Sequence, residues 1–256
     1  MGNINWIGLW TLIKREVGRF FSVYRQTVLP GLISSGLYIL VFGFTLERRI
    51  DEISGVPYTL FILPGLLMMN TLTNATANTS SSMLQMKLLQ QLPDILTAPL
   101  SAIEISIAYI IGGTVRGVVN GVLVMILGII LIDLPVHSPV LTICFIIMVS
   151  WAFSSMGLVL GQLSDSWDQL AMMQNFFLTP LSFLGGVFYS INMLPNWAQV
   201  ISLFNPIYYM INGIRYTTLG IADTSPLTSF IMALIMTIIF TFSAIILMHS
   251  GKKIKQ

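Results

Sequence analysis

The sequence has little charge and almost no cysteine. Only 9% of its 256 residues are charged, against about 25% in ordinary soluble domains, while 55% are hydrophobic. Charge this sparse cannot cover the surface of a soluble domain. The single cysteine, Cys144, excludes a disulfide framework and a cysteine-based metal site. The sequence therefore predicts an integral membrane protein.

Sequence patterns of catalysis are also missing. No P-loop pattern G-x-x-x-x-G-K-[ST] occurs, so the chain cannot bind ATP in that way, and no H-E-x-x-H pattern or histidine–carboxylate cluster indicates a metalloenzyme. Acidic residues fall near the predicted membrane edges, which disfavours a proton- or sodium-coupled carrier. The net charge of +2 is too small to indicate a nucleic-acid partner. We expect a non-catalytic chain that binds no metal or cofactor of its own.

Six apolar runs are long enough to cross a bilayer, which takes about 20 residues. They cover residues 28–46, 58–82, 104–132, 140–161, 170–190 and 227–248, and predict an all-α fold with six transmembrane helices. Six crossings put both termini on one side. That side holds eight basic residues, Lys14, Arg15, Arg19, Arg25, Lys87, Lys252, Lys253 and Lys255, and the other side holds three, Arg48, Arg49 and Arg215. The positive-inside rule therefore predicts cytoplasmic termini, with segments 47–57, 133–139 and 186–226 outside.

Residues 1–27 precede the first run. Aromatic and aliphatic side chains recur there at spacings of three and four, for example Trp6, Trp10 and Phe20, while Arg15 and Arg19 fall on the opposite face. This pattern predicts a helix in the membrane interface, with its basic groups toward the headgroups. It serves either as an anchor or as a docking surface for another protein. The first thirteen residues lack the basic region of a secretory signal peptide.

Polar residues inside the predicted spans are the candidate functional groups. Asn70, Asn74 and Asn78 recur every four residues, so they share one helical face. That face either lines a path for an amphiphilic substrate or makes hydrogen bonds between helices. Arg116 lies about midway along its span, where it contacts an anionic substrate or lipid headgroup, or pairs with backbone carbonyls or a neighbouring span.

A stripe of small residues marks the same span as Arg116. Gly113, Gly117 and Gly121 follow the small-xxx-small spacing that lets membrane helices approach closely. We therefore expect another helix to pack tightly against this face.

Two connections carry further polar and proline-rich sequence. Residues 83–103 include Lys87, Gln91, Pro93 and Asp94, and a helix start at Pro93 suits both proline and the helix dipole. This segment is the best candidate for a contact outside the membrane.

The fifth run breaks at Pro180 and at Gly185–Gly186, and gives way to a shelf over residues 191–226. Two short helices are expected in the shelf, one after Pro195 and one from Pro206 to Leu219. Aromatic residues, Trp197, Phe204, Tyr208, Tyr209 and Tyr216, fit an interfacial belt. The shelf either anchors at the membrane surface or forms a re-entrant lid over a pathway, and its length favours the lid.

These features together resemble the permease subunit of ABC-2 type exporters. The resemblance covers nearly the whole chain and is most specific in Leu178-Thr179-Pro180-Leu181, Gly185-Gly186-Val187-Phe188-Tyr189, Leu194-Pro195, Asn205-Pro206 and Arg215-Tyr216, with Leu96-Thr97-Ala98-Pro99-Leu100 before the third span. It implies a bacterial inner-membrane protein that works as a homodimer with two separate P-loop ATP-binding subunits, which would bind the ATP. It also implies that the N-terminal helix and the 83–103 loop rest on those subunits.

The resemblance assigns roles to particular residues. Asn70, Asn74, Asn78, Arg116, Phe177 and Phe183 would line the substrate pathway; Arg15, Arg19, Lys87, Gln91 and Asp94 would contact the ATPase; Gly185, Gly186, Tyr189, Pro195, Trp197 and Pro206 would form the outer gate. The cargo would be a lipid, a glycolipid or polysaccharide, or a hydrophobic drug. The alternative is a channel or secondary carrier that needs no ATP.

Overall fold

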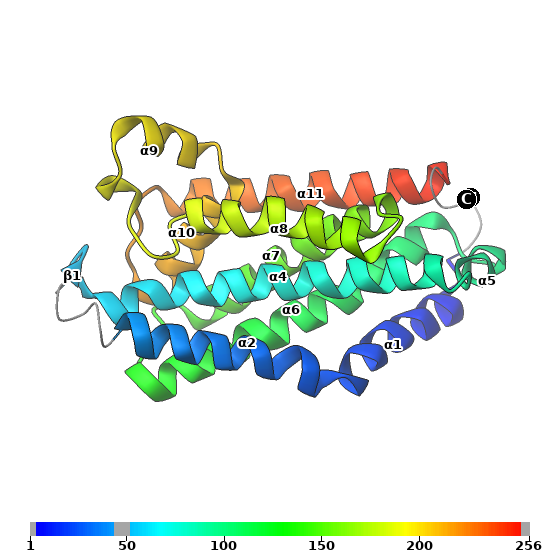
Figure 1. The fold of residues 1–256 in the computed structure, drawn as a ribbon, viewed down its shortest axis with the longest axis horizontal. Helices are drawn as coiled ribbons and strands as arrows, with labels where there is room; N and C mark the ends of the chain where they lie inside the picture. The colour runs from blue at the N-terminus through cyan, green and yellow to red at the C-terminus, as the bar shows by residue number, and fades with distance from the viewer. Residues whose placement is uncertain (1–3, 44–51, 252–256) are drawn as a thin grey trace.

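A computed structural model describes residues 4–43 and 52–251 of the chain. Helices that run lengthwise make up most of it (Figure 1). In chain order the elements are α1 (Trp6–Ser22), α2 (Tyr24–Tyr38), the π-helical turn η1 (Ile39–Gly43), β1 (Glu52–Ile53), β2 (Val56–Pro57), α4 (Tyr58–Leu88), α5 (Leu92–Thr97), α6 (Ala102–Ile132), α7 (Pro139–Leu163), α8 (Trp167–Leu184), the 3₁₀ turn η2 (Ile191–Met193), α9 (Asn196–Leu203), α10 (Pro206–Leu219) and α11 (Pro226–Ser250). The all-α class of the prediction is confirmed.

The connections separate to the two ends of the bundle. The antiparallel hairpin β1–β2, α9 and α10 lie at one end in Figure 1, and α1, α5 and the last turns of α11 lie at the other. We call these the hairpin end and the α5 end. Segments 133–139 and 186–226, both predicted outside, fall at the hairpin end, where His137 and Ser138 donate backbone hydrogen bonds to the carbonyls of Thr218 and Thr217.

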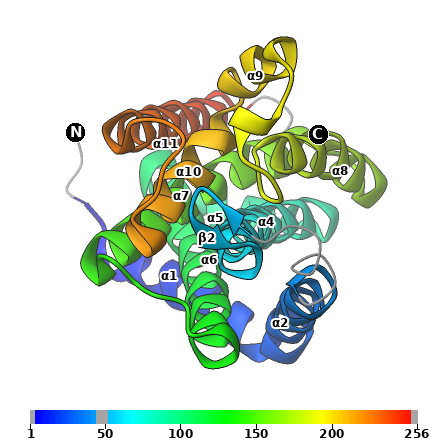
Figure 2. The same cartoon turned by 90° about the vertical axis from the view of Figure 1, so that its left-hand side faces the viewer.

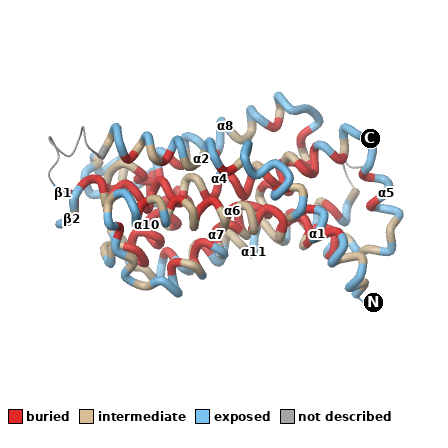
Figure 3. The backbone as a smooth tube through the Cα atoms, turned by 90° about the horizontal axis from the view of Figure 1, so that it is seen from below, coloured by how far each residue is buried: buried red, intermediate tan, exposed pale blue. Residues whose placement is uncertain are grey.

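Helix α4 forms the centre of the bundle. Figure 2 shows it surrounded by the other long helices, and its residues from Phe61 to Met68 are buried. Figure 3 colours the chain by burial. The glycine stripe of α6 packs against α4 and α7: a Cβ on Gly117 would lie 2.9 Å from Ala75 Cβ and 2.8 Å from Ser150 Oγ. The close approach predicted from the stripe is confirmed, because nothing larger than glycine fits there.

Four described helices, α4, α6, α7 and α11, are long and apolar enough to cross a membrane. They match the predicted spans 58–82, 104–132, 140–161 and 227–248, although α4 continues to Leu88. The predicted span 28–46 falls on α2 and η1, with residues 44–46 outside the described part, and span 170–190 falls on α8. These two crossings stay predictions, and so does the total of six.

The charge comparison between the two sides also remains a prediction. Arg48, Arg49, Lys252, Lys253 and Lys255 lie outside the described residues.

The expected break at Pro180 is wrong. Helix α8 continues through Pro180 to Leu184, since one proline removes only one backbone hydrogen bond and membrane helices tolerate that loss. The helix ends instead at the glycine pair, where Gly186 has φ +80°. Asn205 Nδ2 donates to the carbonyl of Leu181 at 2.6 Å, which satisfies an acceptor of the last turn.

The expected orientation of the N-terminal helix also needs correction. Arg19 of α1 does not point outward to headgroups but donates to the carbonyl and the side chain of Asn78 on α4, at 2.8 and 3.1 Å. The side chains of Trp6 and Trp10 are 69% and 58% exposed. The sequence pattern identified an amphipathic helix correctly, but Glu16 and Arg19 of its polar face pack on the protein because Ser82 and Asn78 of α4 offer them polar partners.

The shelf contains the two helices predicted for it, with different surroundings. Helix α9 projects from the bundle, and Trp197 and Phe204 are exposed. Helix α10 begins at Pro206, ends at Gly220 with φ +75° and is buried along most of its length. Tyr208 is therefore a core residue, 1% exposed, and its place in an interfacial belt is wrong.

Candidate functional site

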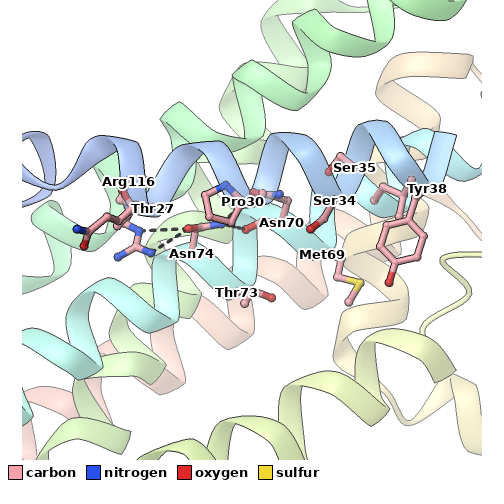
Figure 4. Close-up of a pocket in the computed structure, with 13 residues that line it drawn as sticks. Thr27, Pro30, Ser34, Ser35, Tyr38, Met69, Asn70, Thr73, Asn74 and Arg116 are labelled. Atoms are coloured by element: carbon pink, nitrogen blue, oxygen red, sulfur yellow. Dashed lines mark hydrogen bonds between the residues drawn. The ribbon is translucent and has the colours of Figure 1, made fainter. Parts of the chain in front are cut away.

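A polar groove lies between α2 and α4, with α6 at its base. It encloses about 320 Å³. Its walls combine hydroxyls, amides and one guanidinium with a few apolar groups (Figure 4). The lining residues are Gln26, Thr27, Pro30, Gly31, Ser34, Ser35, Tyr38, Leu66, Met69, Asn70, Thr73, Asn74 and Arg116.

Glycine lets α2 approach the amides of α4. A Cβ on Gly31 would lie 2.6 Å from Asn70 Nδ2, so this position brings the helix backbone against the amide. Asn74 Nδ2 in turn donates to Asn70 Oδ1 at 2.9 Å. The two amides, one helical turn apart, thus form a continuous polar strip along the groove.

Arg116 completes the strip from α6. Its Nε and Nη2 both donate to Asn74 Oδ1, at 3.2 and 3.1 Å, as Figure 4 shows. Two alternatives were predicted for Arg116, an anionic ligand or a pairing within the protein. The structure shows Arg116 paired with a neighbouring helix. Glu104 is used elsewhere, because it caps the start of α6 with Ser101 and accepts from the backbone of Asn5.

The asparagine stripe divides into two environments. Asn70 and Asn74 line the groove, whereas Asn78 is 1% exposed and accepts from Arg19. Burial lowers the pKa of Arg19, and Glu16 opposes that shift. The groove therefore holds the first two of the three amides predicted for a pathway, and the pathway itself stays a prediction.

The two phenylalanines predicted for the pathway do not line this groove. Phe177 and Phe183 lie on α8, 55% and 42% exposed. Phe183 stacks on Phe188 with ring centroids 5.6 Å apart. They form an apolar flank separate from the groove.

The five residues predicted to contact an ATPase have different surroundings at the α5 end. Lys87 donates to the carbonyls of Gln162 and Ser164, at 3.0 and 2.7 Å, and pairs with Asp165. Arg15 and Arg19 also bond inside the chain, to Met86 and Asn78. Arg15, Gln91 and Asp94 are exposed, and the last two lie at the tip.

The residues predicted for the outer gate cluster at the hairpin end. Gly185 and Gly186 end α8, Pro195 precedes α9 and Pro206 starts α10. Tyr189 donates its hydroxyl to the carbonyl of Phe183 at 3.1 Å, and Trp197 is 69% exposed.

Two charged residues are buried although the sequence did not predict their burial. Arg215 is 1% exposed, donates to the carbonyl of Gly186 at 2.8 Å and lies 3.6 Å from the carboxylate of Asp223. Glu16 is fully buried and accepts from Ser82 Oγ at 2.6 Å. No local sequence pattern marks either residue as buried. Glu16 stands in a run of charged residues, and Arg215 stands in a segment predicted to lie outside the membrane.

The fold and the groove together define a class: an α-helical membrane protein with several crossings and a polar groove beside its central helix. The described residues hold no group of three or more histidines, cysteines or carboxylates that fits a metal ion.

Comparison with known proteins identifies the family. The sequence model of the ABC-2 type transporter family matches residues 8–219, and the chain belongs to this family. It is 35% identical, over the full length of both chains, to the inner membrane transport permease YadH of Escherichia coli K12. It is also 26% identical over 235 residues to nodulation protein J of Rhizobium leguminosarum bv. viciae, covering 86% of this chain and 84% of the relative. The predicted resemblance is confirmed.

Proposed function

We propose that the chain is the transmembrane subunit of an ATP-driven exporter in a bacterial inner membrane, with its termini in the cytoplasm. The observation that carries this proposal is the family match over residues 8–219, together with a polar groove among apolar helices and the lack of a P-loop. In this function a pair of separate P-loop subunits binds and hydrolyses ATP. The permease supplies the pathway for an amphiphilic cargo such as a lipid, a glycolipid or a hydrophobic drug.

The α5 end is the proposed contact with the ATPase. The short helix α5 projects beyond the ends of the long helices (Figure 1), and its Asp94 is exposed. Lys87 ties the end of α4 to the α7–α8 connection through two carbonyls and Asp165. In this proposal a push on α5 reaches the end of α4, which Lys87 links to the α7–α8 connection.

The test uses the chain together with a P-loop ATPase, sought first in the neighbouring reading frames. We expect the two to copurify and to hydrolyse ATP with sensitivity to vanadate. Asp94→Lys, a charge reversal at the proposed contact, should weaken copurification or uncouple hydrolysis from the permease. Glu52→Lys makes the same reversal at the exposed hairpin end and should leave both intact. Transport driven by an ion gradient, with no ATPase bound, would instead establish a carrier.

We propose a homodimer whose interface includes α2. Large apolar side chains on α2, Leu29, Ile33 and Leu37, are 49%, 59% and 56% exposed beside the polar groove. A second copy placed there would cover this face and close the groove from lipid.

Cysteine cross-linking tests the dimer. Cys144→Ser removes the only cysteine, and Ile33→Cys in that background should give a covalent dimer on oxidation in membranes. Ile246→Cys, on α11 across the bundle and 63% exposed, should stay monomeric under the same conditions. Equal cross-linking at both sites would contradict an α2 interface.

The shelf is the proposed outer gate. Helix α10 is packed among α4, α7 and α11, while α9 remains exposed, so α9 can move without disrupting the core. In this proposal α9 and the Gly185–Gly186 connection form the movable part of a re-entrant lid.

A further inference from the structure

We propose that the groove between α2 and α4 binds the negatively charged head of an amphiphile, a phosphate or carboxylate, with Arg116 as the counter-charge. The proposal rests on the function above and narrows its cargo to an anionic amphiphile. The observation behind it is a cation placed among apolar helices with a cavity beside it and no carboxylate to neutralise it.

Arg116 has a partner but no counter-ion. Both of its hydrogen bonds go to one amide oxygen, Asn74 Oδ1, and Nη1 has no acceptor among residues 4–43 and 52–251. No described carboxylate lies within 4.0 Å of it. Its charged neighbour is Arg19, which carries the same sign. A partly buried charge without an opposite charge is costly, so the groove gains stability when an anion enters.

The other internal arginines show that the missing carboxylate is specific to the groove. Arg19 lies 3.7 Å from Glu16, and Arg215 lies 3.6 Å from Asp223. Both of those arginines are neutralised by the chain itself. Only Arg116 of these three faces a cavity, and only Arg116 lacks a carboxylate.

The groove also offers neutral donors suited to an oxyanion. The hydroxyls of Ser34, Ser35 and Thr73 line the cavity and make no hydrogen bond to another described residue. In Figure 4 Asn74 and Asn70 lie between Arg116 and the two serines, so the free Nη1 of Arg116 can meet the charged oxygens of a head group while the hydroxyls meet its other polar atoms. Hydroxyls and an arginine are the donors that such groups prefer.

The surroundings of the groove favour an anion that carries an apolar tail. Arg116 lies about midway along α6, and Gln26 and Thr27 at the start of α2 line the groove with it. The wall formed by α2 carries the exposed apolar residues Leu29, Ile33 and Leu37, which face lipid or a second copy. An amphiphile can place its head at Arg116 while its tail lies along this apolar face of α2, a contact that a free anion cannot make.

Ligand-induced stabilisation of the full-length chain in dodecyl maltoside tests the proposal. Three probes are added separately: dodecyl phosphate, dodecyl trimethylammonium with the same tail and opposite charge, and inorganic phosphate. We expect dodecyl phosphate at ten times its Kd to raise the unfolding midpoint by about 3–5 °C. The other two probes should leave it unchanged. Equal stabilisation by inorganic phosphate or by the cation would overturn the proposal.

Two substitutions locate the binding. Arg116→Gln should abolish the shift caused by dodecyl phosphate, while Arg25→Gln, the same change at an exposed arginine near the start of α2, should keep it. Asn74→Asp leaves Arg116 in place but gives it a carboxylate at the position of the present amide. This variant should fold and yet show no rise in unfolding midpoint with dodecyl phosphate. It therefore tests the site even where Arg116→Gln yields no protein. A full shift in either groove variant refutes the site.

The outcome is separable from that of the proposed function. A chain that binds dodecyl phosphate through Arg116 but pairs with no ATPase would keep the anion site and refute the exporter. A chain that drives vanadate-sensitive hydrolysis with its partner, yet shows no response to dodecyl phosphate, would keep the exporter and refute the anionic cargo.

Discussion

Arg116 and Arg215 are both placed inside the helical bundle, but their surroundings differ in kind. Arg215 has a carboxylate at 3.6 Å, the carbonyl of Gly186 at 2.8 Å and the ring of Phe61 at 3.9 Å from its guanidinium carbon. Arg116 has one amide oxygen and a cavity. The first is enclosed by the protein, and the second is left open on one side.

The surroundings of Arg215 show what a structural arginine needs. Asp223 also accepts from Ser190 Oγ at 2.7 Å and from the backbone of Ile191 at 3.3 Å. The pair therefore joins the end of α8, η2 and α10 at the hairpin end. Such a pair holds segments together because removing either partner leaves a buried charge. Arg116 holds only α6 to α4, so its charge is free to serve a ligand.

The largest expected effect comes from removing the enclosed arginine. Arg215→Met should lower the free energy of unfolding by about 3–5 kcal/mol, because Asp223 stays buried without its cation. Thermal unfolding of the purified protein measures this, with Arg25→Met as the exposed control. A midpoint equal to wild type would show that the enclosed pair contributes nothing to stability.

The partner carboxylate should matter somewhat less. Asp223→Asn should cost about 2–3 kcal/mol, since Arg215 retains the Gly186 carbonyl and the Phe61 ring and the new amide can still accept a hydrogen bond. The double variant with Arg215→Met should cost less than the sum of the two single variants by about 1–3 kcal/mol. Strict additivity would mean that the two groups do not interact.

Removing the carboxylate of Glu16 should cause an intermediate loss of unfolding free energy. Glu16→Gln removes the carboxylate beside Arg19 but keeps an acceptor for Ser82, so we expect a loss of about 1.5–2 kcal/mol. The same variant leaves Arg19 as a second unneutralised cation near Arg116. Denaturant unfolding followed by circular dichroism measures the change; an unaltered midpoint would mean that water already neutralises this site.

Adding a carboxylate should act in the opposite direction. Asn74→Asp should stabilise the empty protein by up to about 1 kcal/mol, because the counter-ion that Arg116 gains outweighs the lost hydrogen bonds from Asn74 Nδ2 to Asn70. Asn78→Asp is the matched control: its arginine already has Glu16, so a further carboxylate should bring no gain. Stabilisation by both variants alike would remove the distinction between the two asparagines.

The smallest effect is expected for Arg116 itself. Arg116→Gln should change the unfolding free energy by less than about 1 kcal/mol, because the lost hydrogen bonds are offset by the removal of an unneutralised charge. The losses of unfolding free energy for Arg116→Gln and Arg215→Met, measured in the same thermal assay, compare the two arginines directly. A loss as large as that of Arg215→Met would make Arg116 structural too.

The sequence predicted helix ends well where the ends have local causes. Helix α10 starts at Pro206 after the Asn205 cap and ends at Gly220, and the glycine stripe of α6 correctly indicated a close neighbour. Predictions failed where a distant contact decides. The inward turn of Arg19 depends on Asn78, and the burial of Tyr208 depends on how α10 packs within the bundle. Asn78 is far from Arg19 in the sequence, and the helices that cover Tyr208 are far from α10. No local sequence pattern therefore predicts either contact.

The sequence alone therefore determined the class of protein, the long helices and the polar groups within them, because apolar length, proline, glycine and the four-residue spacing of amides act through neighbouring residues. Only the tertiary structure decided which polar groups were already neutralised. Glu16 meets Arg19 and Asp223 meets Arg215 through packing between segments, and Arg116 is left facing a cavity. Whether a buried charge is paired depends on what folding brings beside it, and that separates a structural arginine from one available to a ligand.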